Sequence, residues 1–438
     1  MTIFQGDVFD VSSKMKNNTY DGIISDPPYG LSFMGKKWDH SVPSKKVWKM
    51  LLKKCKPGAY LMAFGGTRTY HRLVCAIEDA GWKIKDTLCW LYGQGFPKSH
   101  NIGKYMEQEA KDGSCRKIKR KGIGNLNGNF KCFEKKEDIE ITNDWKGYGT
   151  ALKPSVEFIV LAQKPIEKNY VSNCKKYGCG GMNIDGSRIG EDNICSNLIT
   201  TTNSSMHFAN NGIKATQLKK TETHIGRWPA NLILDEEAGK MLDEQSGKTG
   251  AFAPVKSGQK GFGGEIYGKY ASGGDDGKSF YGDGLAGASR FFYCPKCSTK
   301  ERNLGCEDLE EIEVDTRSDV AKGSFTEKGI SPAKNNHPCI KPIDLCRYLA
   351  NLIKPPTENS KILVPFSGSG SEMLGCLLAG WTQVDGIELD QHYIDIANKR
   401  IASIDKYKAL LEKKYQKVKT QVEEIEEKFE ETDLFGEK

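Results

Sequence analysis

A turn with the residue types needed to hold an amine stands near the N-terminus, where Ser25-Asp26-Pro27-Pro28-Tyr29-Gly30 directly follows the apolar pair Ile23-Ile24. Two successive prolines lack amide donors and keep the chain extended, so the turn is rigid. Asp26 and the Pro27 carbonyl are acceptors that can aim at one point, and the Tyr29 ring offers a flat face beside them. This set suits a flat heterocycle with an exocyclic amine. An ordinary exit from a strand into a loop is the alternative.

A glycine-rich loop stands near the C-terminus. The apolar run 362–366 leads into Ser367-Gly368-Ser369-Gly370, a helical pattern follows over 371–379, and a second apolar run ends at Glu388. Strand, glycine turn, helix, strand and terminal acid are typical of the nucleotide-binding half of a Rossmann-like fold, although a purely structural turn is the alternative. Met373 occupies the place of the third glycine in the dinucleotide fingerprint. A nucleoside cofactor without phosphates is therefore favoured over a pyrophosphate, and S-adenosyl-L-methionine fits that description.

The composition limits the class of protein. The chain has 438 residues, of which 38 % are hydrophobic and 28 % charged, with 47 glycines and 16 prolines, which indicates a folded, loop-rich protein of one or two large domains. No apolar run approaches the ~20 residues that span a bilayer, and the N-terminus lacks the pattern of a signal peptide. We therefore expect a cytoplasmic protein. The formal charge of +7 favours an anionic partner.

The elements that position these motifs follow from the hydrophobic pattern. Residues 1–100 alternate short apolar runs with helical patterns near 47–56 and 70–80, which predicts an α/β domain with a parallel sheet. Another strand is expected at VEFIVLAQKP. We predict the following division: 1–165 as one half of the core domain with a basic insertion at about 104–148, 166–285 as an irregular region, 286–402 as the other half, and 403–438 as a charged helix.

The fourteen cysteines are scattered, as expected for a reduced chain. Cys294 and Cys297 have the spacing of zinc ligands, and Cys306 is a candidate third ligand. A structural zinc site needs four ligands, and no second pair with this spacing stands nearby. The sequence therefore favours unmetallated thiols and predicts no metal.

Together the two motifs strongly resemble the amino-group DNA methyltransferases, and their order, amine turn first and glycine loop last, resembles the permuted β class of that family. The matching segments also include Ala63–His71, Gly95–Ser99, Gly149–Pro154 and Gly226–Asn231, together with Met34–Asp39, His337-Pro338 and Lys341-Pro342. They look like the site-specific adenine methyltransferases of phages and bacteria. The resemblance implies a Rossmann-like fold that uses S-adenosyl-L-methionine, plus a target-recognition region at 166–285.

The resemblance also implies roles for individual residues. Asp26 and the Pro27 carbonyl would hold the amine of a flipped adenine, Pro28 would stiffen the turn, and Tyr29 would stack on the base. The implied cofactor pocket comprises Asp7, Phe366, Ser367, Gly368, Ser369, Gly370, Glu388, His337 and Lys341, with Glu388 on the ribose and Lys341 as a candidate for the methionine carboxylate. Transfer would be direct, because no Pro-Cys pair stands in the setting needed for a covalent cysteine intermediate; Pro338-Cys339 lies in the cofactor segment.

Two alternatives stay open at this point. The family more often has Ser in place of Asp26 when it methylates cytosine at N4, so adenine N6 is favoured over that rival. The family also usually has Asp where this chain has Val364, which removes one polar contact at the cofactor loop. A catalytically silent DNA-binding relative is therefore the third reading.

Double-stranded DNA is the expected partner. The basic residues Arg116, Lys117, Lys119, Arg120 and Lys121 form a candidate phosphate-binding loop, with a solvated charged loop as the alternative. Arg227 is a candidate for sequence readout, whereas Trp228 suits either readout or the core. In the C-terminal helix an apolar stripe from Ile404 to Phe429 recurs at three- and four-residue steps. It predicts packing on the chain's own domain or, alternatively, a homodimer.

Overall fold

The computed structural model describes residues 1–31, 39–93, 95, 99–112, 141–197, 221–247, 287–295, 299–309, 312–315, 330–335, 337 and 340–413. The chain divides into a large unit of 1–93, 156–312 and 333–438 and a small unit of 94–155 and 313–332. The predicted basic run 116–121, the second zinc-spaced cysteine Cys297 and the stripe beyond residue 413 lie outside the described residues.

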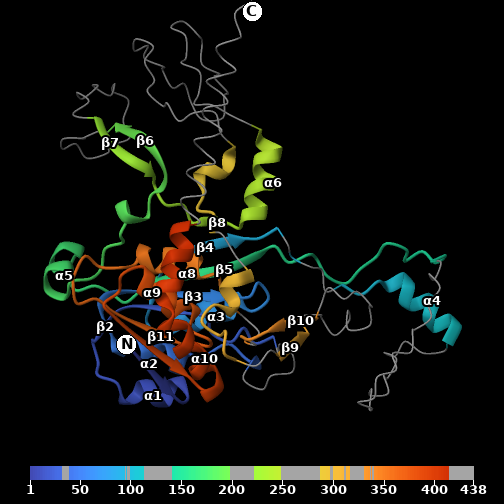
Figure 1. The fold of residues 1–438 in the computed structure, drawn as a ribbon, viewed down its shortest axis with the longest axis horizontal. Coiled ribbons are helices and arrows are strands. Elements are labelled where there is room, and N and C mark those ends of the chain that lie inside the picture. The colour runs from blue at the N-terminus through green and yellow to red at the C-terminus, as the bar shows by residue number, and fades with distance from the viewer. Residues whose placement is uncertain are drawn as a thin grey trace, which may run out of the picture. The chain divides into compact units, whose positions relative to one another are not determined.

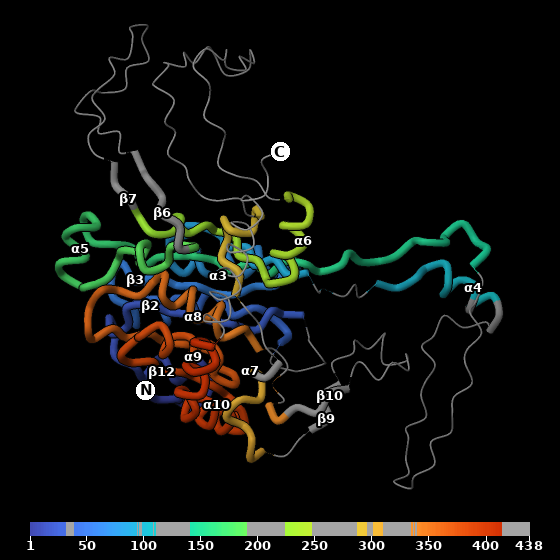
Figure 2. Tube along the Cα trace, turned by 45° about the horizontal axis from the view of Figure 1, so that its top comes forward, coloured from blue at the N-terminus to red at the C-terminus, as the bar shows by residue number. Residues whose placement is uncertain are grey.

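One eight-stranded sheet forms the centre of the large unit (Figure 1). Its strand order is β1-β12-β11-β2-β3-β5-β4-β8. The strands span β1 Thr2–Gln5, β2 Tyr20–Ser25, β3 Cys55–Gly65, β4 Lys83–Leu91, β5 Val156–Gln163, β8 Leu232–Leu234, β11 Lys361–Pro365 and β12 Gln383–Glu388. The first and last parts of the sequence meet in this sheet, because β1 pairs with β12 and β2 pairs with β11, and Figure 2 shows these ends of the chain together.

The sheet is parallel except at one strand. From β1 to β3 every neighbouring pair is parallel, and β4 pairs parallel with β8. The predicted strand at VEFIVLAQKP is β5, and it runs antiparallel to both β3 and β4. This orientation arises because the chain leaves β4 at Leu91 and re-enters the sheet at Val156, opposite that same residue. The prediction of an α/β sheet is confirmed, with β5 as the one antiparallel member.

Helices cover both faces of the sheet (Figure 1). They are α1 Val8–Lys14, α2 Lys45–Lys54 and α3 Tyr70–Asp79 on one face, and α8 Ile343–Leu352, α9 Ser371–Leu378 and α10 Gln391–Ala402 on the other. Side chains alternate between the two faces along each strand. Ile23 and Leu61 therefore pack in the cluster with α2 and α3, whereas Ile24 and Met62 pack in the cluster with α8 and α9. Burial on both faces explains why these strands read as continuous apolar runs.

The described part of the predicted irregular region contains regular elements. They are α5 Tyr170–Tyr177, η3 Asp185–Ser187, the antiparallel pair β6 Ile189–Asn197 and β7 Thr221–Arg227, strand β8 and α6 Glu236–Ser246. Further along the chain are η4 Ala288–Phe291, α7 Thr299–Asn303 and the two-stranded sheet of β9 Ile312–Asp315 and β10 Ile330–Ala333. Polar residues cap the two longer helices: at the start of α6, Asp235 Oδ1 accepts a hydrogen bond from the Ala238 amide at 2.7 Å.

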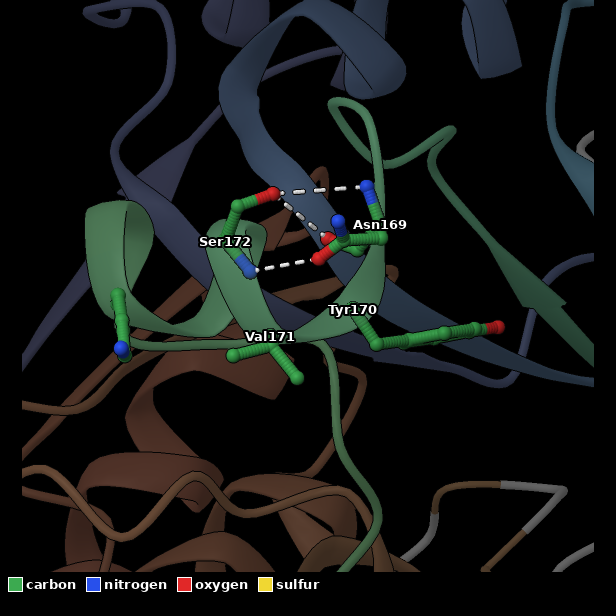
Figure 3. Close-up of a pocket in the computed structure, with 5 residues that line it drawn as sticks. Asn169, Tyr170, Val171 and Ser172 are labelled. Atoms are coloured by element: carbon green, nitrogen blue, oxygen red, sulfur yellow. Dashed lines mark hydrogen bonds between the residues drawn. The ribbon is translucent and has the colours of Figure 1, made fainter.

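Helix α5 begins with a capping box (Figure 3). The Asn169 side chain accepts a hydrogen bond from the Ser172 amide at 2.9 Å, and the Ser172 hydroxyl accepts one from the Asn169 amide. A surface hollow beside this turn is lined by Tyr170, Val171 and Lys175 together with those two residues. None of the residues predicted for the active site lines it.

The small unit is built around α4 Ile102–Asp112. A single carboxylate oxygen, Glu107 Oε1, accepts hydrogen bonds from the amides of Thr142 and Asn143 at 3.0 and 3.2 Å, and from the Asn143 side chain at 2.9 Å. These bonds fasten the segment that follows residue 140 to the helix. The only described parts of the predicted basic insertion are therefore an ordered helix and turn.

Residues 404–413 are helical, as expected for the start of the C-terminal helix. The first two residues of the apolar stripe pack on the chain's own core: Tyr407 is 1 % exposed and Ile404 is partly buried against the same cluster. Over the described residues, the apolar stripe therefore packs on the chain's own domain. No helix in the described part of the chain is long and apolar enough to cross a membrane.

Candidate active site

The two predicted motifs meet at one edge of the sheet. Strands β1, β12, β11 and β2 are parallel neighbours, so the loops that follow their carboxyl ends lie together, where ligands of open α/β sheets bind. The amine turn follows β2 and the glycine loop follows β11. The two strand ends are tied to each other, because the Ser25 hydroxyl donates to the Pro365 carbonyl at 3.3 Å.

The glycine loop has the backbone that its composition predicts. Gly368 and Gly370 have φ values of +49° and +82°, which favour glycine, and Phe366 adopts a φ of +62° at the start of the loop. A non-glycine residue in this region is strained, and such strain is typical of ligand-binding loops. The amide and the hydroxyl of Ser367 both donate to the Ile387 carbonyl, at 2.9 and 3.3 Å, so Ser367 holds the loop to β12.

Glu388 organises the loop from the end of β12. Its Oε2 accepts a hydrogen bond from the Gly368 amide at 2.8 Å, and its Oε1 accepts one from the Asp390 amide at 3.0 Å. Burial raises the pKa of this carboxyl. Asp7 lies at the same edge, because the Gly6 amide donates to the Glu388 carbonyl, and its side chain caps α1 through the Phe9 amide at 2.8 Å. Asp7 and Glu388, the two acidic residues predicted to bind the cofactor, therefore lie at the edge of the sheet that carries the glycine loop. Each also accepts a hydrogen bond from a backbone amide of the protein.

Arg400 of α10 is buried beneath the glycine loop and donates hydrogen bonds to it. Its guanidinium donates to the Ser369 carbonyl at 2.6 Å and to the hydroxyls of Ser369 and Ser371 at 3.2 and 3.0 Å. The Tyr407 hydroxyl accepts a further bond from Arg400 Nε at 3.2 Å. Ser369 is thus turned toward the protein. Arg400 can be recognised in the sequence by one feature. It is a charged residue on the side of α10 whose other residues are apolar and buried, and a charge in that position needs hydrogen-bond partners.

His337 lies over the loop. A Cβ atom placed on Gly368 would come within 2.7 Å of His337 Nε2, so the glycine is required for this close approach. The imidazole packs edge-on against Tyr393, with ring centroids 4.6 Å apart, and the His337 carbonyl accepts a bond from Arg302 at 3.2 Å. The structure therefore brings His337 next to the predicted cofactor loop.

The amine turn is rigid, as its sequence predicts. The Tyr29 hydroxyl donates to Glu157 Oε2 at 3.0 Å, and the Tyr29 carbonyl accepts from the Thr69 hydroxyl at 2.6 Å. Gly30, with φ +68°, and Leu31 both donate their amides to the buried Asp39 carboxylate, at 2.8 and 3.2 Å. Pro27 is buried and Pro28 is half-buried. Hydrogen bonds at the hydroxyl and at the backbone carbonyl of Tyr29 thus fix the position of its ring.

Asp26, just after the end of β2, is half-buried with a side chain that is 12 % exposed, and one of its two oxygens is engaged. Its Oδ2 accepts from Lys341 Nζ at 2.9 Å, whereas its Oδ1 has no hydrogen-bond partner in the part of the chain that the structure describes. Burial and the neighbouring Glu157 raise the pKa of Asp26, and Lys341 opposes that rise. A further carboxyl, Glu372 of α9, is buried nearby, and burial together with the charge of Asp26 raises its pKa to about 7.

Lys341 lies at the amine turn. The resemblance assigned it to a cofactor carboxylate, but its ammonium lies between Asp26 and Glu157, 3.3 Å from Glu157 Oε2. Sequence reasoning also missed Glu157 and Glu372. Glu157 is the only charged residue of β5, a strand made mostly of apolar residues. A charged side chain in such a strand indicates that an oppositely charged group lies close to it. Val364, in contrast, is fully buried in the core of β11, where its side chain packs with apolar neighbours.

The candidate readout residues lie at the end of β7. The Trp228 side chain is 65 % exposed, which excludes the core alternative, and the Arg188 guanidinium lies 5.6 Å from the centre of its ring. Arg227 stacks on Phe291 at 5.1 Å and contacts the Arg290 carbonyl. Stacked arginine and aromatic side chains are a frequent feature of nucleic-acid contacts.

The alternative of a zinc site at Cys294 has little support in the described residues. Cys294 is half-buried, and burial together with Asp243 and Asp235 raises the pKa of its thiol to about 11, which disfavours the thiolate that a metal requires. Among the described residues no group of three or more His, Cys, Asp or Glu side chains could hold a metal ion.

Comparison with known proteins gives a family. The family model described as DNA methylase, N6_N4_Mtase, matches residues 20–399. The Type II methyltransferase M.HindIII of Haemophilus influenzae is 26 % identical over 195 residues, which are 42 % of this chain and 53 % of that protein. The chain therefore spans about half the length of this curated relative.

Solved structures with related folds have low identity. The M1.HpyAVI–SAM complex is 13 % identical with a TM-score of 0.34, covering 91 % of this chain and 97 % of the other. TTHA0409 of Thermus thermophilus, complexed with S-adenosyl-L-methionine, is 10 % identical with a TM-score of 0.36, covering 92 % and 93 %. The cytosine-N4-specific PvuII DNA methyltransferase is 9 % identical with a TM-score of 0.39, covering 91 % and 85 %. Because the family model spans both the amine turn and the glycine loop, this chain belongs to the N6/N4 DNA methylase family.

Proposed function

We propose that this chain transfers a methyl group to the N6 amine of adenine in double-stranded DNA, and that it is a β-class enzyme with permuted motif order. The observation that carries the proposal is the Oδ1 atom of Asp26, which is buried without a hydrogen-bond partner among the described residues, at the sheet edge that also holds the glycine loop. A buried acceptor without a partner is costly unless a ligand supplies the donor. An exocyclic amine of a flipped base is such a donor.

The residues present fit S-adenosyl-L-methionine, the cofactor predicted from the glycine loop and in agreement with family membership. Because Gly368 has no Cβ atom, its backbone can approach His337, and Gly370 likewise leaves room for Ala397 of α10 to pack against the loop. In this proposal Glu388 binds the ribose hydroxyls, which its position at the end of β12 beside the Gly368 amide supports, and Asp7 follows the Gly6 amide that donates to the Glu388 carbonyl. When bound, this cofactor supplies an electrophilic methyl group on a sulfonium.

The chain's own residues then act by positioning. The target amine is a poor nucleophile because its lone pair is delocalised into the ring. Hydrogen bonds from the amine to Asp26 Oδ1 and to the Pro27 carbonyl favour a pyramidal nitrogen, whose lone pair is then free to attack. Tyr29 fixes the plane of the base, and the burial of the turn excludes water. The amine nitrogen would bond to the methyl group as the methyl–sulfur bond breaks, which leaves a neutral thioether. The nitrogen would then release one proton to Asp26 or to water, and no covalent bond to the enzyme would form.

Methylation of cytosine at N4 is the second candidate, because both bases present an exocyclic amine and the family includes both activities by name. We favour adenine because Asp26 stands where the cytosine enzymes more often have Ser. Incubation with labelled S-adenosyl-L-methionine and duplex DNA, followed by mass spectrometry of the nucleosides, distinguishes them. We expect N6-methyladenine. N4-methylcytosine would establish the rival, and unlabelled DNA would contradict both.

We further propose that 166–285 is the target-recognition region and that Trp228 contacts DNA. Replacing Trp228 by alanine should weaken DNA binding about tenfold, since one base–aromatic stack contributes ~1–3 kcal/mol. Fluorescence anisotropy with a labelled duplex measures the Kd. Phe9→Ala is the control, because Phe9 is also an exposed aromatic residue but lies on α1, outside the proposed recognition region. Equal Kd values for the two variants would contradict this role.

A further inference from the structure

The Lys341 ammonium occupies a site that the proposed reaction does not account for. Its Nζ lies 2.9 Å from Asp26 Oδ2 and 3.3 Å from Glu157 Oε2. It also lies 5.2 and 5.0 Å from the ring centres of Tyr29 and Phe64. The side chain is only 7 % exposed. The charge is therefore enclosed by two carboxylates and two aromatic faces.

The two oxygens of Asp26 differ because of this lysine. Lys341 takes Oδ2, and Oδ1 is buried with no partner among the described residues. A carboxylate at the end of a strand can rotate about its last bond, and a hydrogen bond to one oxygen fixes that rotation. The lysine is restrained as well, because its ammonium lies 3.3 Å from Glu157 Oε2 and its backbone directly precedes Pro342, the N-cap of α8. Oδ1 thus has one defined direction before any base arrives.

We propose that Lys341 is a positioning residue, which holds Asp26 charged and aims its free oxygen at the target amine. This inference rests on the proposed function. It replaces the role that the family resemblance assigned to Lys341, contact with the carboxylate of the cofactor. The two roles predict different effects of removing the ammonium.

The charged groups around Asp26 determine in which direction its pKa moves when Lys341 is removed. Facing it are Glu157 from β5, Tyr29 from its own loop, Glu372 from α9 and Lys341 from the loop before α8. Of these groups Lys341 is the cation, and it lowers the pKa of Asp26 against the effects of burial and Glu157. Asp26 must be ionised to accept strongly, so activity is lost as the pH falls through its pKa. Removing Lys341 raises that pKa and moves the acid limb of the rate profile to higher pH.

The test replaces Lys341 by methionine, which keeps the length of the side chain without its charge. We expect kcat/KM for DNA at neutral pH to fall at least about tenfold, and the acid limb of kcat/KM to move up by about one pH unit or more. Calorimetry should show the Kd for S-adenosyl-L-methionine within about twofold of that of the parent protein. The second variant, Glu157→Gln, removes a like charge and should move the acid limb to lower pH.

The control is Lys56→Met. Lys56 Nζ pairs at 2.6 Å with the buried Asp21, near the other end of β2, so this variant also removes a lysine from a buried carboxylate but should leave the acid limb in place. A cofactor Kd at least tenfold weaker in Lys341→Met, with an unmoved acid limb, would overturn the inference in favour of the carboxylate role. An unmoved acid limb in both Lys341→Met and Glu157→Gln would also overturn it. If the parent protein methylates no DNA, the proposed function fails separately, and the calorimetric comparison still tests Lys341.

Discussion

Replacing Asp26 by alanine should lower kcat for methyl transfer at least ~100-fold, the effect of removing one preorganised polar group from a catalytic site. The carboxylate lies just after the end of β2, and its buried Oδ1 is the atom we assign to the target amine. Without it, only the Pro27 carbonyl is left to accept a hydrogen bond from the amine, so the pyramidal nitrogen is less favoured. The Kd for S-adenosyl-L-methionine should change by less than about twofold, because the glycine loop makes its own hydrogen bonds to Glu388 and Arg400.

Single-turnover methylation of a labelled duplex measures the first quantity, and calorimetry measures the second. Asp26→Asn is the matched variant, because it keeps the shape of the side chain but loses the charge, and it should be intermediate in kcat. Thermal unfolding of both variants is needed as a control, since Lys341 loses one of its two carboxylate partners. A folded alanine variant with near-normal turnover would contradict the proposed mechanism.

The second large effect is expected at Gly368. Alanine there would carry a φ of +49°, which costs ~1–2 kcal/mol for a residue with a Cβ atom. Its Cβ would also lie 2.7 Å from His337 Nε2, and that ring is held by Tyr393 and by the backbone bond from Arg302. Either the loop or His337 must move. We expect the Kd for S-adenosyl-L-methionine to rise at least about tenfold, which is ~1.4 kcal/mol.

Gly380→Ala separates backbone strain from close approach. Gly380 follows α9, has a φ of +82°, and a Cβ there would meet only the end of Lys354 at 3.7 Å. Both variants should lose stability in thermal unfolding through the positive φ, and Gly368→Ala should lose at least as much as Gly380→Ala because of its additional contact with His337. Only Gly368→Ala should weaken the cofactor in calorimetry, and an equal loss of affinity in the two variants would show that His337 plays no part in the pocket.

The sequence alone predicted the elements well where the pattern is long and apolar. The predicted helices at 47–56 and 70–80 are α2 and α3, displaced by at most two residues at each end. The strand, glycine turn, helix and strand of 361–388 also form as predicted, because apolar runs of this length have one way to bury themselves and glycines mark the turn. The structure then shows both motifs at the carboxyl edge of the sheet, where neighbouring parallel strands end together.

Other features depended on contacts between residues far apart in the sequence. The direction of β5 is one, since hydrophobic pattern is the same for parallel and antiparallel strands. The partners of Asp26 are another, because Lys341 is 315 residues away along the chain. The residues next to Asp26 and Lys341 in the sequence do not indicate which charged group each of them pairs with.

The sequence by itself thus determined the chemistry that is present: an acceptor turn, an aromatic face and a glycine loop at the ends of parallel strands. Only the tertiary structure decided which oxygen of Asp26 is free, which lysine neutralises it, and that Trp228 faces solvent rather than the core. The physical reason is that motif chemistry is set by neighbours in the chain, whereas burial and charge pairing are set by the packing of distant strands and helices.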